Sequence, residues 1–213
     1  MTFIKQGENG YPLQLTRYLG EQAPKSIALR GNLGIWLRRD TPLLALFCSA
    51  KALGSIILQI HDLAQQWRTG GVTVISGFHS PVEQECLAVL LRGPQPVIVC
   101  PARGLARMRL KREYKAPIAA GRLLLMSPFE EKVRRMTADT ALTRNRFVAA
   151  LADTVLIAHA QPGSKTEQLA REVVGWGKQV YTLDNTVNEH LLALGAKLLV
   201  QQMGGISQPA ALP

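Results

Sequence analysis

Residues 143–182, TRNRFVAALADTVLIAHAQPGSKTEQLAREVVGWGKQVYT, decide the fold of this chain. In the middle of this stretch, residues 154–158 form a continuous apolar run, which is typical of a parallel strand covered on both faces. A turn at residues 161–163 follows, and the sequence Ser-Lys-Thr-Glu from Ser164 to Glu167 predicts the start of a helix. In such a capping box the Ser164 hydroxyl accepts from the Glu167 N–H, and the Glu167 carboxylate accepts from the Ser164 N–H.

A strand, a glycine turn and a helix N-terminus in this order form a natural anion cradle, because free N–H groups and the positive helix end point the same way. Gly163, Ser164 and Lys165 are the candidate phosphate-binding residues of this turn. A lysine is unfavourable in a first helical turn, which favours a phosphate contact for Lys165, whereas Ser164 is equally well explained as a helix cap. We expect Arg144 and Arg146 to reach this cradle.

Short apolar runs alternate with helical patterns along the whole chain, which indicates βαβ units. The expected strands are residues 43–48, 72–76, 96–100, 123–127, 154–158, 179–183 and 197–200. The first connecting helix is marked by apolar residues at helical spacing, namely Ile56, Ile57, Ile60, Leu63, Ala64 and Trp67. The second begins with a capping box at Ser80 and Glu83 and has a stripe of Val82, Cys86, Val89 and Leu90. The fold class is therefore α/β, with a doubly wound, mostly parallel sheet flanked by helices and a short N-terminal appendage.

In a sheet of this type, ligands bind beyond the carboxyl ends of the strands. The further candidates at these ends are Ser49 and Lys51, then Ser76, Gly77 and His79, then Arg103 and Gly104. Gly77 is also explained by crowding in a tight turn, and His79 by a loop histidine without an acidic partner. We expect His159, at the end of residues 154–158, to be exposed and inert.

Composition sets the outer bounds. At 213 residues and 47% hydrophobic, the chain is long enough for one well-buried domain. We assign residues 1–40 to an N-terminal lead-in segment, residues 41–203 to the domain and residues 204–213 to a flexible tail. No segment approaches the roughly 18 apolar residues of a membrane span or resembles a signal peptide, so we expect a cytoplasmic protein without membrane association.

The three cysteines, Cys48, Cys86 and Cys100, have no Cys-x-x-Cys spacing and are interpreted as small core residues. Motifs for a nucleophile elbow, a P-loop, a His-x-x-x-His pair and a Gly-x-Gly-x-x-Gly fingerprint are missing. We therefore expect no catalytic residue, no metal and no cofactor.

The net charge of +10 is concentrated in one segment. Residues 103–146 hold 12 Lys or Arg against four Asp or Glu, a net +8. Such clustering is typical of a polyanion binder, whereas the alternative is a solvated basic helix. Within residues 103–115, Tyr114 is a candidate for stacking on a base.

The order of these motifs resembles the DNA-processing protein A family, the DprA/Smf recombination mediators. Their Rossmann-like domain carries an Arg-Asn-Arg helix, here Arg144, Asn145 and Arg146, followed by a strand and a Ser-Gly-Ser loop. Residues 47–51 stand where the family has a Gly-Ser-Arg turn, and residues 74–78 look like its strand ending in Ser-Gly. The likeness covers roughly residues 11–200, without the winged-helix region that many members append.

The chain also departs from the family pattern at four places, one of which is Leu87, where the family has a His. Lys51 replaces the Arg of the first turn, and Pro81-Val82-Glu83 stands in place of Gly-Ile-Asp. The loop at Gly163 is one residue shorter. Lys is a point charge and Arg a planar fork, so the change at Lys51 alters how a phosphate would be held.

Two functions of different classes remain open. The resemblance implies a non-enzymatic, homodimeric protein that binds single-stranded DNA and loads a recombinase. On this interpretation, Arg144 and Arg146 contact phosphate and contribute little to folding. The alternative is a nucleoside-monophosphate phosphoribohydrolase of the lysine-decarboxylase-like group, whose Pro-Gly-Gly-x-Gly-Thr-x-x-Glu loop is matched only in part by residues 162–167.

Overall fold

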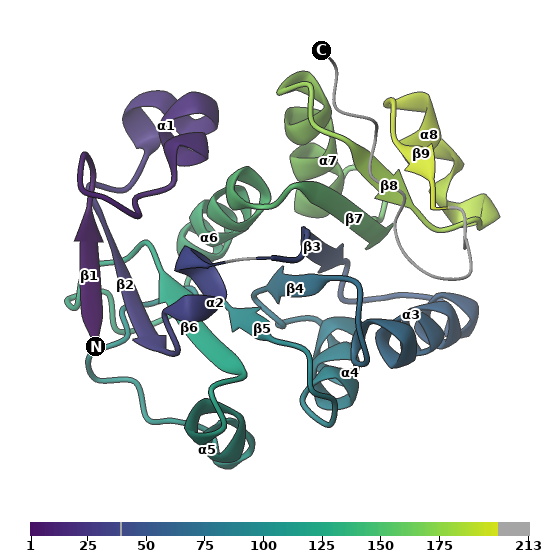
Figure 1. Cartoon of the computed structure of the whole chain (residues 1–213). Coiled ribbons are helices and arrows are strands. Elements are labelled where there is room, and N and C mark those ends of the chain that lie inside the picture. Colours follow the sequence, from purple (N-terminus) through teal and green to yellow (C-terminus); the bar gives the residue numbers. More distant parts are fainter. Residues whose placement is uncertain (39, 200–213) are drawn as a thin grey trace.

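The structure, a computed structural model, describes residues 1–38 and 40–199. Within them one nine-stranded sheet has the order β1-β2-β6-β5-β4-β3-β7-β8-β9 (Figure 1). The strands are β1 (Thr2–Lys5), β2 (Ser26–Gly31), β3 (Leu43–Cys48), β4 (Thr73–Ser76), β5 (Val97–Val99), β6 (Leu123–Ser127), β7 (Thr154–His159), β8 (Val180–Thr182) and β9 (Lys197–Leu198). From β6 to β9 every pairing is parallel, which confirms the expected Rossmann-like, mostly parallel sheet.

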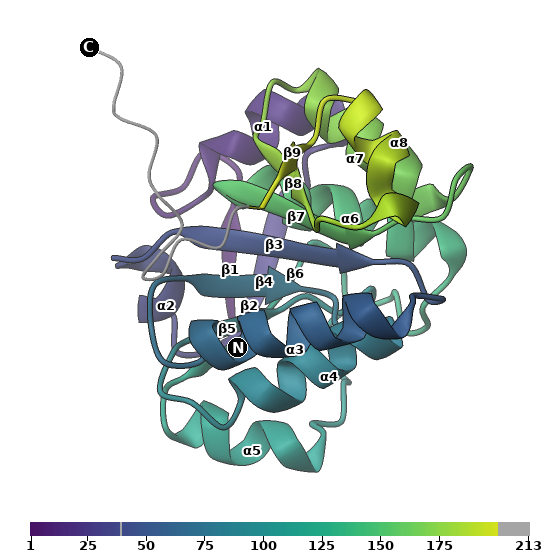
Figure 2. The same cartoon turned by 90° about the vertical axis from the view of Figure 1, so that its right-hand side faces the viewer.

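Helices cover both faces of this sheet. They are α1 (Leu13–Leu19), α2 (Gly34–Leu37), α3 (Gly54–Trp67), α4 (Pro81–Leu90), α5 (Arg112–Ala119), α6 (Ala138–Leu151), α7 (Lys165–Gly175) and α8 (Glu189–Ala193), with short 3₁₀ turns η1 (Gly20–Gln22) and η2 (Thr186–Asn188). Figure 2 shows α3, α4 and α5 on one side of the central strands, and α1, α7 and α8 on the other. Among the described residues, none of these helices is long and apolar enough to cross a membrane.

Each face of the sheet has its own hydrophobic core. Along β7, Val155 and Ile157 belong to the core under α1, α6 and α7, whereas Leu156 and Ala158 belong to the core under α3 and α4. All four side chains have no exposed surface. The continuous apolar run is therefore explained as predicted, because successive side chains of a strand point to opposite faces and both faces are covered.

The helices follow the predicted patterns with one exception. In α3 the side chains of Ile56, Ile60, Leu63, Ala64 and Trp67 are buried, but Ile57 is 40% exposed. In α4 the predicted capping box forms between Ser80 and Glu83. The three cysteines are buried, as expected.

The N-terminal segment contains two strands that the sequence pattern did not predict. β2 pairs antiparallel with β6, and β1 pairs antiparallel with β2, so both extend the sheet at one edge (Figure 1). Ile27 and Leu29 of β2 have no exposed surface. The pattern of β2 is weak because its short apolar run is followed directly by Arg30. The predicted tail, residues 204–213, and the last residue of the predicted strand 197–200 lie outside the described residues.

The order of strands also locates the place where ligands bind in such sheets. β3 lies between β4 and β7, and the helices that follow β3 and β7 cover opposite faces. In doubly wound sheets, ligands bind outside the carboxyl ends of the strands at this topological switch point.

Candidate nucleic-acid interface

Four parallel strands, β5, β4, β3 and β7, end side by side at the carboxyl edge of the sheet, and each is followed by a cationic or titratable side chain. In the order of these strands, the side chains are Arg103, His79, Lys51 and Lys165. The four residues follow neighbouring strands of the sheet, and we call them the row. Arg103 is half-buried and the other three are exposed.

The two candidate serines at this edge serve the backbone turns. The Ser49 hydroxyl accepts from the Gln161 N–H at 3.1 Å and so joins the end of β3 to the loop after β7. The Ser76 hydroxyl donates to the Leu46 carbonyl at 2.7 Å and accepts from the Phe78 N–H at 3.2 Å. Both side chains are buried, and their hydrogen bonds shape the edge on which a ligand would lie.

Glu83 is the residue of this edge whose role the sequence reasoning missed. Its carboxylate accepts from the N–H groups of Cys48 at 2.9 Å, His79 at 2.7 Å and Ser80 at 3.2 Å. Only 5% of the residue is exposed, and burial raises the pKa of the carboxyl, whereas these hydrogen bonds and Arg144 lower it. The capping-box pattern predicts the contact of Glu83 with Ser80, but no sequence pattern predicts its contact with the end of β3.

Arg144 is almost completely buried, with 4% of its surface exposed. Its Nη1 group donates to the Cys100 carbonyl at 3.1 Å, and its Nε donates to the Asn145 side-chain oxygen at 2.7 Å. The guanidinium lies directly on Gly77, where a Cβ would stand 1.1 Å from Nη1. Burial lowers the pKa of Arg144, and the nearby Glu83 carboxylate raises it. Gly77 is thus required by the close approach of Arg144.

The structure corrects the expectation that Arg144 and Arg146 both reach the loop after β7. Arg144 lies at the ends of β4 and β5 and does not reach the loop after β7, and its burial makes it part of the folded core. Arg146 pairs with Glu172 of α7 at 2.8 Å, on a different side of α6. Residues two apart on a helix cannot share one face, which is why the two side chains separate.

The loop after β7 closes on itself in a manner that differs from the predicted capping box. The Ser164 hydroxyl accepts from the Glu167 N–H at 3.2 Å, as predicted, but the Glu167 carboxylate accepts from the Gly163 N–H at 2.7 Å instead of the Ser164 N–H. Gly163 has a φ of +74°, which favours glycine. Lys165 is exposed and makes no hydrogen bond or ion pair within the described chain, so its side chain can contact a ligand.

Two basic loops adjoin this row at the ends of β5 and β6. The two loops are residues 100–111 and 128–137. They lie in contact, and the Gly104 N–H of the first donates to the Val133 carbonyl of the second at 2.8 Å. A Cβ at Gly104 would stand 2.5 Å from the Glu130 carbonyl, so the loops touch closely. We call these two loops, together with the first residues of α5, the basic loop pair.

The basic loop pair presents exposed cations. Lys111 and Lys132 are offset by Glu113 and Glu130, at 3.7 and 2.8 Å. The exposed cations without such a neighbour in the described structure are Arg107, Arg109, Arg112, Lys115, Arg134 and Arg135. Much of the net positive charge of residues 103–146 therefore lies in the two loops that follow β5 and β6 and at the start of α5.

The structure contradicts the expected exposure of two aromatic side chains, Tyr114 and His159. Tyr114 was a candidate for base stacking, but it is 5% exposed and packs in the core under α5, so it cannot stack on a base. His159 is 6% exposed instead of open to solvent, and its Nδ1 lies 2.9 Å from the Asn188 side-chain oxygen.

Within the described chain, Arg103 has one hydrogen-bonded group, its carbonyl, and one unpaired group, its Nε. Its carbonyl accepts from the Ser127 hydroxyl at 2.8 Å and so joins the ends of β5 and β6. Its Nε is buried and has no acceptor within the described residues. A buried donor without a partner is costly, and this atom has no exposed surface, so the rest of the half-buried side chain is what a ligand could contact.

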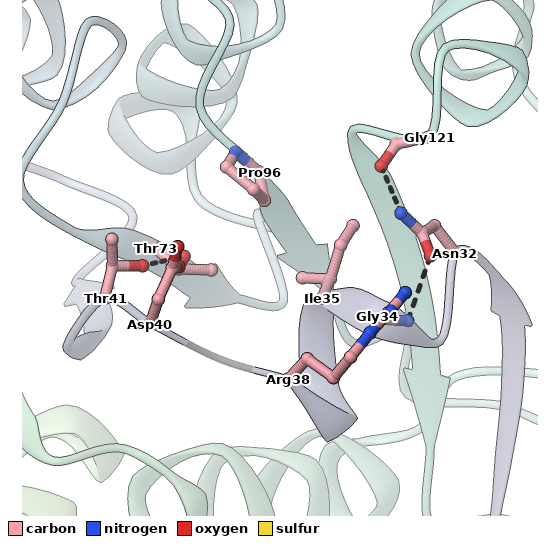
Figure 3. A pocket seen from close by; sticks show the side chains of 9 residues that line it. All are labelled: Asn32, Gly34, Ile35, Arg38, Asp40, Thr41, Thr73, Pro96 and Gly121. Atoms are coloured by element: carbon pink, nitrogen blue, oxygen red, sulfur yellow. Dashed lines mark hydrogen bonds between the residues drawn. The ribbon is translucent and has the colours of Figure 1, made fainter.

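A cavity of about 250 Å³ lies at the opposite, amino edge of the sheet (Figure 3). It is lined by Asn32, Gly34, Ile35, Arg38, Asp40, Thr41, Thr73, Pro96 and Gly121. Its main polar groups satisfy one another: the Asn32 amide bonds the Gly121 carbonyl and the Gly34 N–H, both at 2.9 Å, and the hydroxyls of Thr41 and Thr73 lie 2.8 Å apart. None of the predicted site residues lines this cavity.

No group of three His, Cys, Asp or Glu side chains within residues 1–38 and 40–199 is arranged to hold a metal ion. The carboxyl edge presents cations and the two imidazoles of His79 and His159. Such a surface can bind a polyanion.

Comparison with known proteins identifies relatives of the same architecture. Residues 2–210 match the family model of DNA recombination-mediator protein A. DNA processing protein A from Streptococcus pneumoniae is 18% identical with a TM-score of 0.77, over 93% of this chain and 70% of that one. The Helicobacter pylori protein, described for its single-stranded DNA binding mode, is 20% identical with a TM-score of 0.72, over 92% and 90% of the two chains.

A more distant fold likeness is to the molybdenum cofactor binding protein from Rippkaea orientalis. It is 13% identical with a TM-score of 0.54, over 75% of this chain and 88% of that one. No curated protein sequence is significantly similar to this chain.

Proposed function

This chain belongs to the DNA recombination-mediator protein A family, and from that premise we propose that it binds single-stranded DNA across the carboxyl edge of its sheet. The observation that carries the proposal is the concentration of exposed cations in the segments that follow β3, β5, β6 and β7. The basic loop pair at the ends of β5 and β6 leads into the row formed by Arg103, His79, Lys51 and Lys165. A flexible polyanion fits such a band, because each neutralised phosphate releases counterions.

The two parts of the band would hold phosphates in different ways. The arginines of the basic loop pair are exposed, so they offer long-range attraction and flexible contacts. Arg103 is half-buried and its carbonyl accepts from the Ser127 hydroxyl, so it offers a charge held close to the strand ends. Lys51 provides a point charge, which suits a phosphate that is not held in one orientation.

The finer role is proposed from the family alone. We propose that the protein works in the cytoplasm as a homodimer without enzymatic activity and delivers the bound strand to a recombinase. For the phosphoribohydrolase alternative, no observation within the described residues gives support. Glu167, its nearest carboxylate, is bound to the Gly163 N–H of its own loop.

A salt titration of binding tests the interface. With a fluorescent thymidine 20-mer, the double variant Arg134→Ala/Arg135→Ala should weaken binding and reduce the slope of log K against log salt by about 1.4, at roughly 0.7 per lost contact. The matched control is Arg38→Ala/Arg92→Ala, which removes two exposed charges near the amino edge.

The two variants have the same net charge, so a general charge effect would change both titrations alike. Equal slopes for the two variants, or no binding of the oligonucleotide by the parent protein at low salt, would overturn the proposed interface. A lower slope for the first variant alone supports it.

A further inference from the structure

The imidazole of His159 is held in one orientation by a buried amide. Asn188, with no exposed surface, lies in η2 and donates from its side-chain nitrogen to the carbonyls of Ala158 at 2.9 Å and Leu183 at 3.3 Å. Carbonyl oxygens can only accept hydrogen bonds, so the nitrogen end of the amide is assigned without ambiguity. The amide oxygen therefore faces the His159 Nδ1, 2.9 Å away.

This arrangement determines the tautomer of the neutral ring. An amide oxygen can only accept, so the His159 Nδ1 must carry the hydrogen. The Nε2 atom then presents a lone pair. It has no hydrogen-bond partner within the described residues, and it is not one of the fully buried polar atoms left without a partner. The ring thus offers one oriented acceptor that solvent can reach.

The position of this acceptor is the topological switch point of the sheet. His159 is the last residue of β7 and stands in register with Cys48, the last residue of β3. The Ser49 N–H donates to the His159 carbonyl at 2.8 Å, which holds the two strand ends together. α3 and α7, which follow these strands, cover opposite faces, and ligands of doubly wound sheets bind at this point.

The chemistry of the acceptor selects the part of a ligand that it can bind. A phosphodiester has acceptors and no donor, so it does not match a bare Nε2, whereas the cations of the same edge suit it. A nucleobase carries N–H donors on its pairing edge. We propose that His159, oriented by Asn188, accepts a hydrogen bond from a base N–H and so places one base of the strand at the ends of β3 and β7. This inference rests on the proposed function.

Thymine provides a sharp probe, because N3–H is its only N–H donor in DNA. We expect a thymidine 12-mer to bind about 3- to 10-fold more tightly than the same oligomer methylated at N3, the range of one net hydrogen bond. In His159→Leu the two oligomers should bind equally. His61→Leu, which removes an exposed histidine of α3, is the matched control and should keep the preference.

A second measurement on the unmodified protein does not depend on how the variant folds. Nitrogen NMR of the ring should show hydrogen on Nδ1 and none on Nε2, and the Nε2 resonance should move when the thymidine oligomer is added. A protonated Nε2 and bare Nδ1, or a preference that persists in His159→Leu, would overturn the base contact and leave the DNA-binding proposal intact. Absence of any DNA binding would overturn both.

Discussion

Arg144 and Glu83 are ionisable residues that the fold buries almost completely, at 4% and 5% exposure. Taking such groups out of water costs several kcal/mol each, and the cost is offset only when hydrogen bonds and charge complement them. Glu83 has three backbone donors at the ends of β3 and β4, and Arg144 bonds the carbonyl of Cys100 after β5. Together they hold the ends of three strands on which the proposed interface lies.

Removal of the Arg144 side chain should therefore lower the stability of the fold more than removal of the partly exposed Arg146 side chain. We expect Arg144→Ala to lower the free energy of unfolding by about 2–3 kcal/mol, because Glu83 loses its compensating cation and Cys100 its donor. Arg146→Ala breaks only a partly exposed pair and should cost at most about 1 kcal/mol. Urea denaturation of the two variants measures both values, and equal losses would contradict this role of Arg144.

At the level of elements, one lysine closes the end of a helix. The Lys178 ammonium, after α7, donates to the carbonyls of Ala149, Ala150 and Ala152 at the C-terminus of α6. It also lies 4.5 Å from the centre of the Tyr18 ring of α1, which stacks on Trp176. The last carbonyls of a helix lack partners within it and carry a partial negative charge, so a cation there both bonds and stabilises them.

The change Lys178→Met keeps the aliphatic stem and deletes these bonds. We expect it to lower the free energy of unfolding by about 1–2 kcal/mol. The reason is that the last carbonyls of α6 lose their hydrogen-bond donor and the helix dipole loses a nearby cation. Lys25→Met, at an exposed lysine, should have almost no effect. Thermal and urea unfolding followed by circular dichroism compare the two, and a neutral result for Lys178→Met would show that water replaces the ammonium without loss.

At the scale of the whole molecule, the N-terminal residues complete the sheet. β2 covers the edge of β6 with backbone hydrogen bonds and buries Ile27 and Leu29, while α1 packs on α6 (Figure 1). An uncovered edge strand with apolar neighbours is prone to pair with other chains. The lead-in segment, residues 1–40, therefore contributes to the same core as the parallel strands.

Truncation tests this contribution. We expect a fragment that starts at residue 41 to aggregate or to lose cooperative unfolding, because the β6 edge and the apolar face beneath α1 become exposed. Gel filtration and urea denaturation of the fragment, beside the whole chain, measure this. A monomeric fragment with an unchanged unfolding midpoint would show that residues 1–40 are a separate appendage.

The sequence alone determined the features that depend on neighbouring residues. The apolar run at residues 154–158, the α4 capping box at Ser80 and the amphipathic pattern of α3 predicted a doubly wound parallel sheet, because strand period, helix period and caps are local. The excess of basic residues in 103–146 likewise predicted a concentrated charge. The exposed Ile57 and the shifted capping bond of Glu167 mark the limit of such patterns.

The tertiary structure alone decided which side chains meet. That Arg144 turns to Cys100 and Gly77 while Arg146 turns to Glu172 depends on which elements pack beside α6. The pairing of His159 with Asn188, 29 residues later in the chain, likewise arises only when η2 folds over the end of β7. These contacts join residues distant in sequence, and burial of the whole core selects them, so no local pattern encodes them.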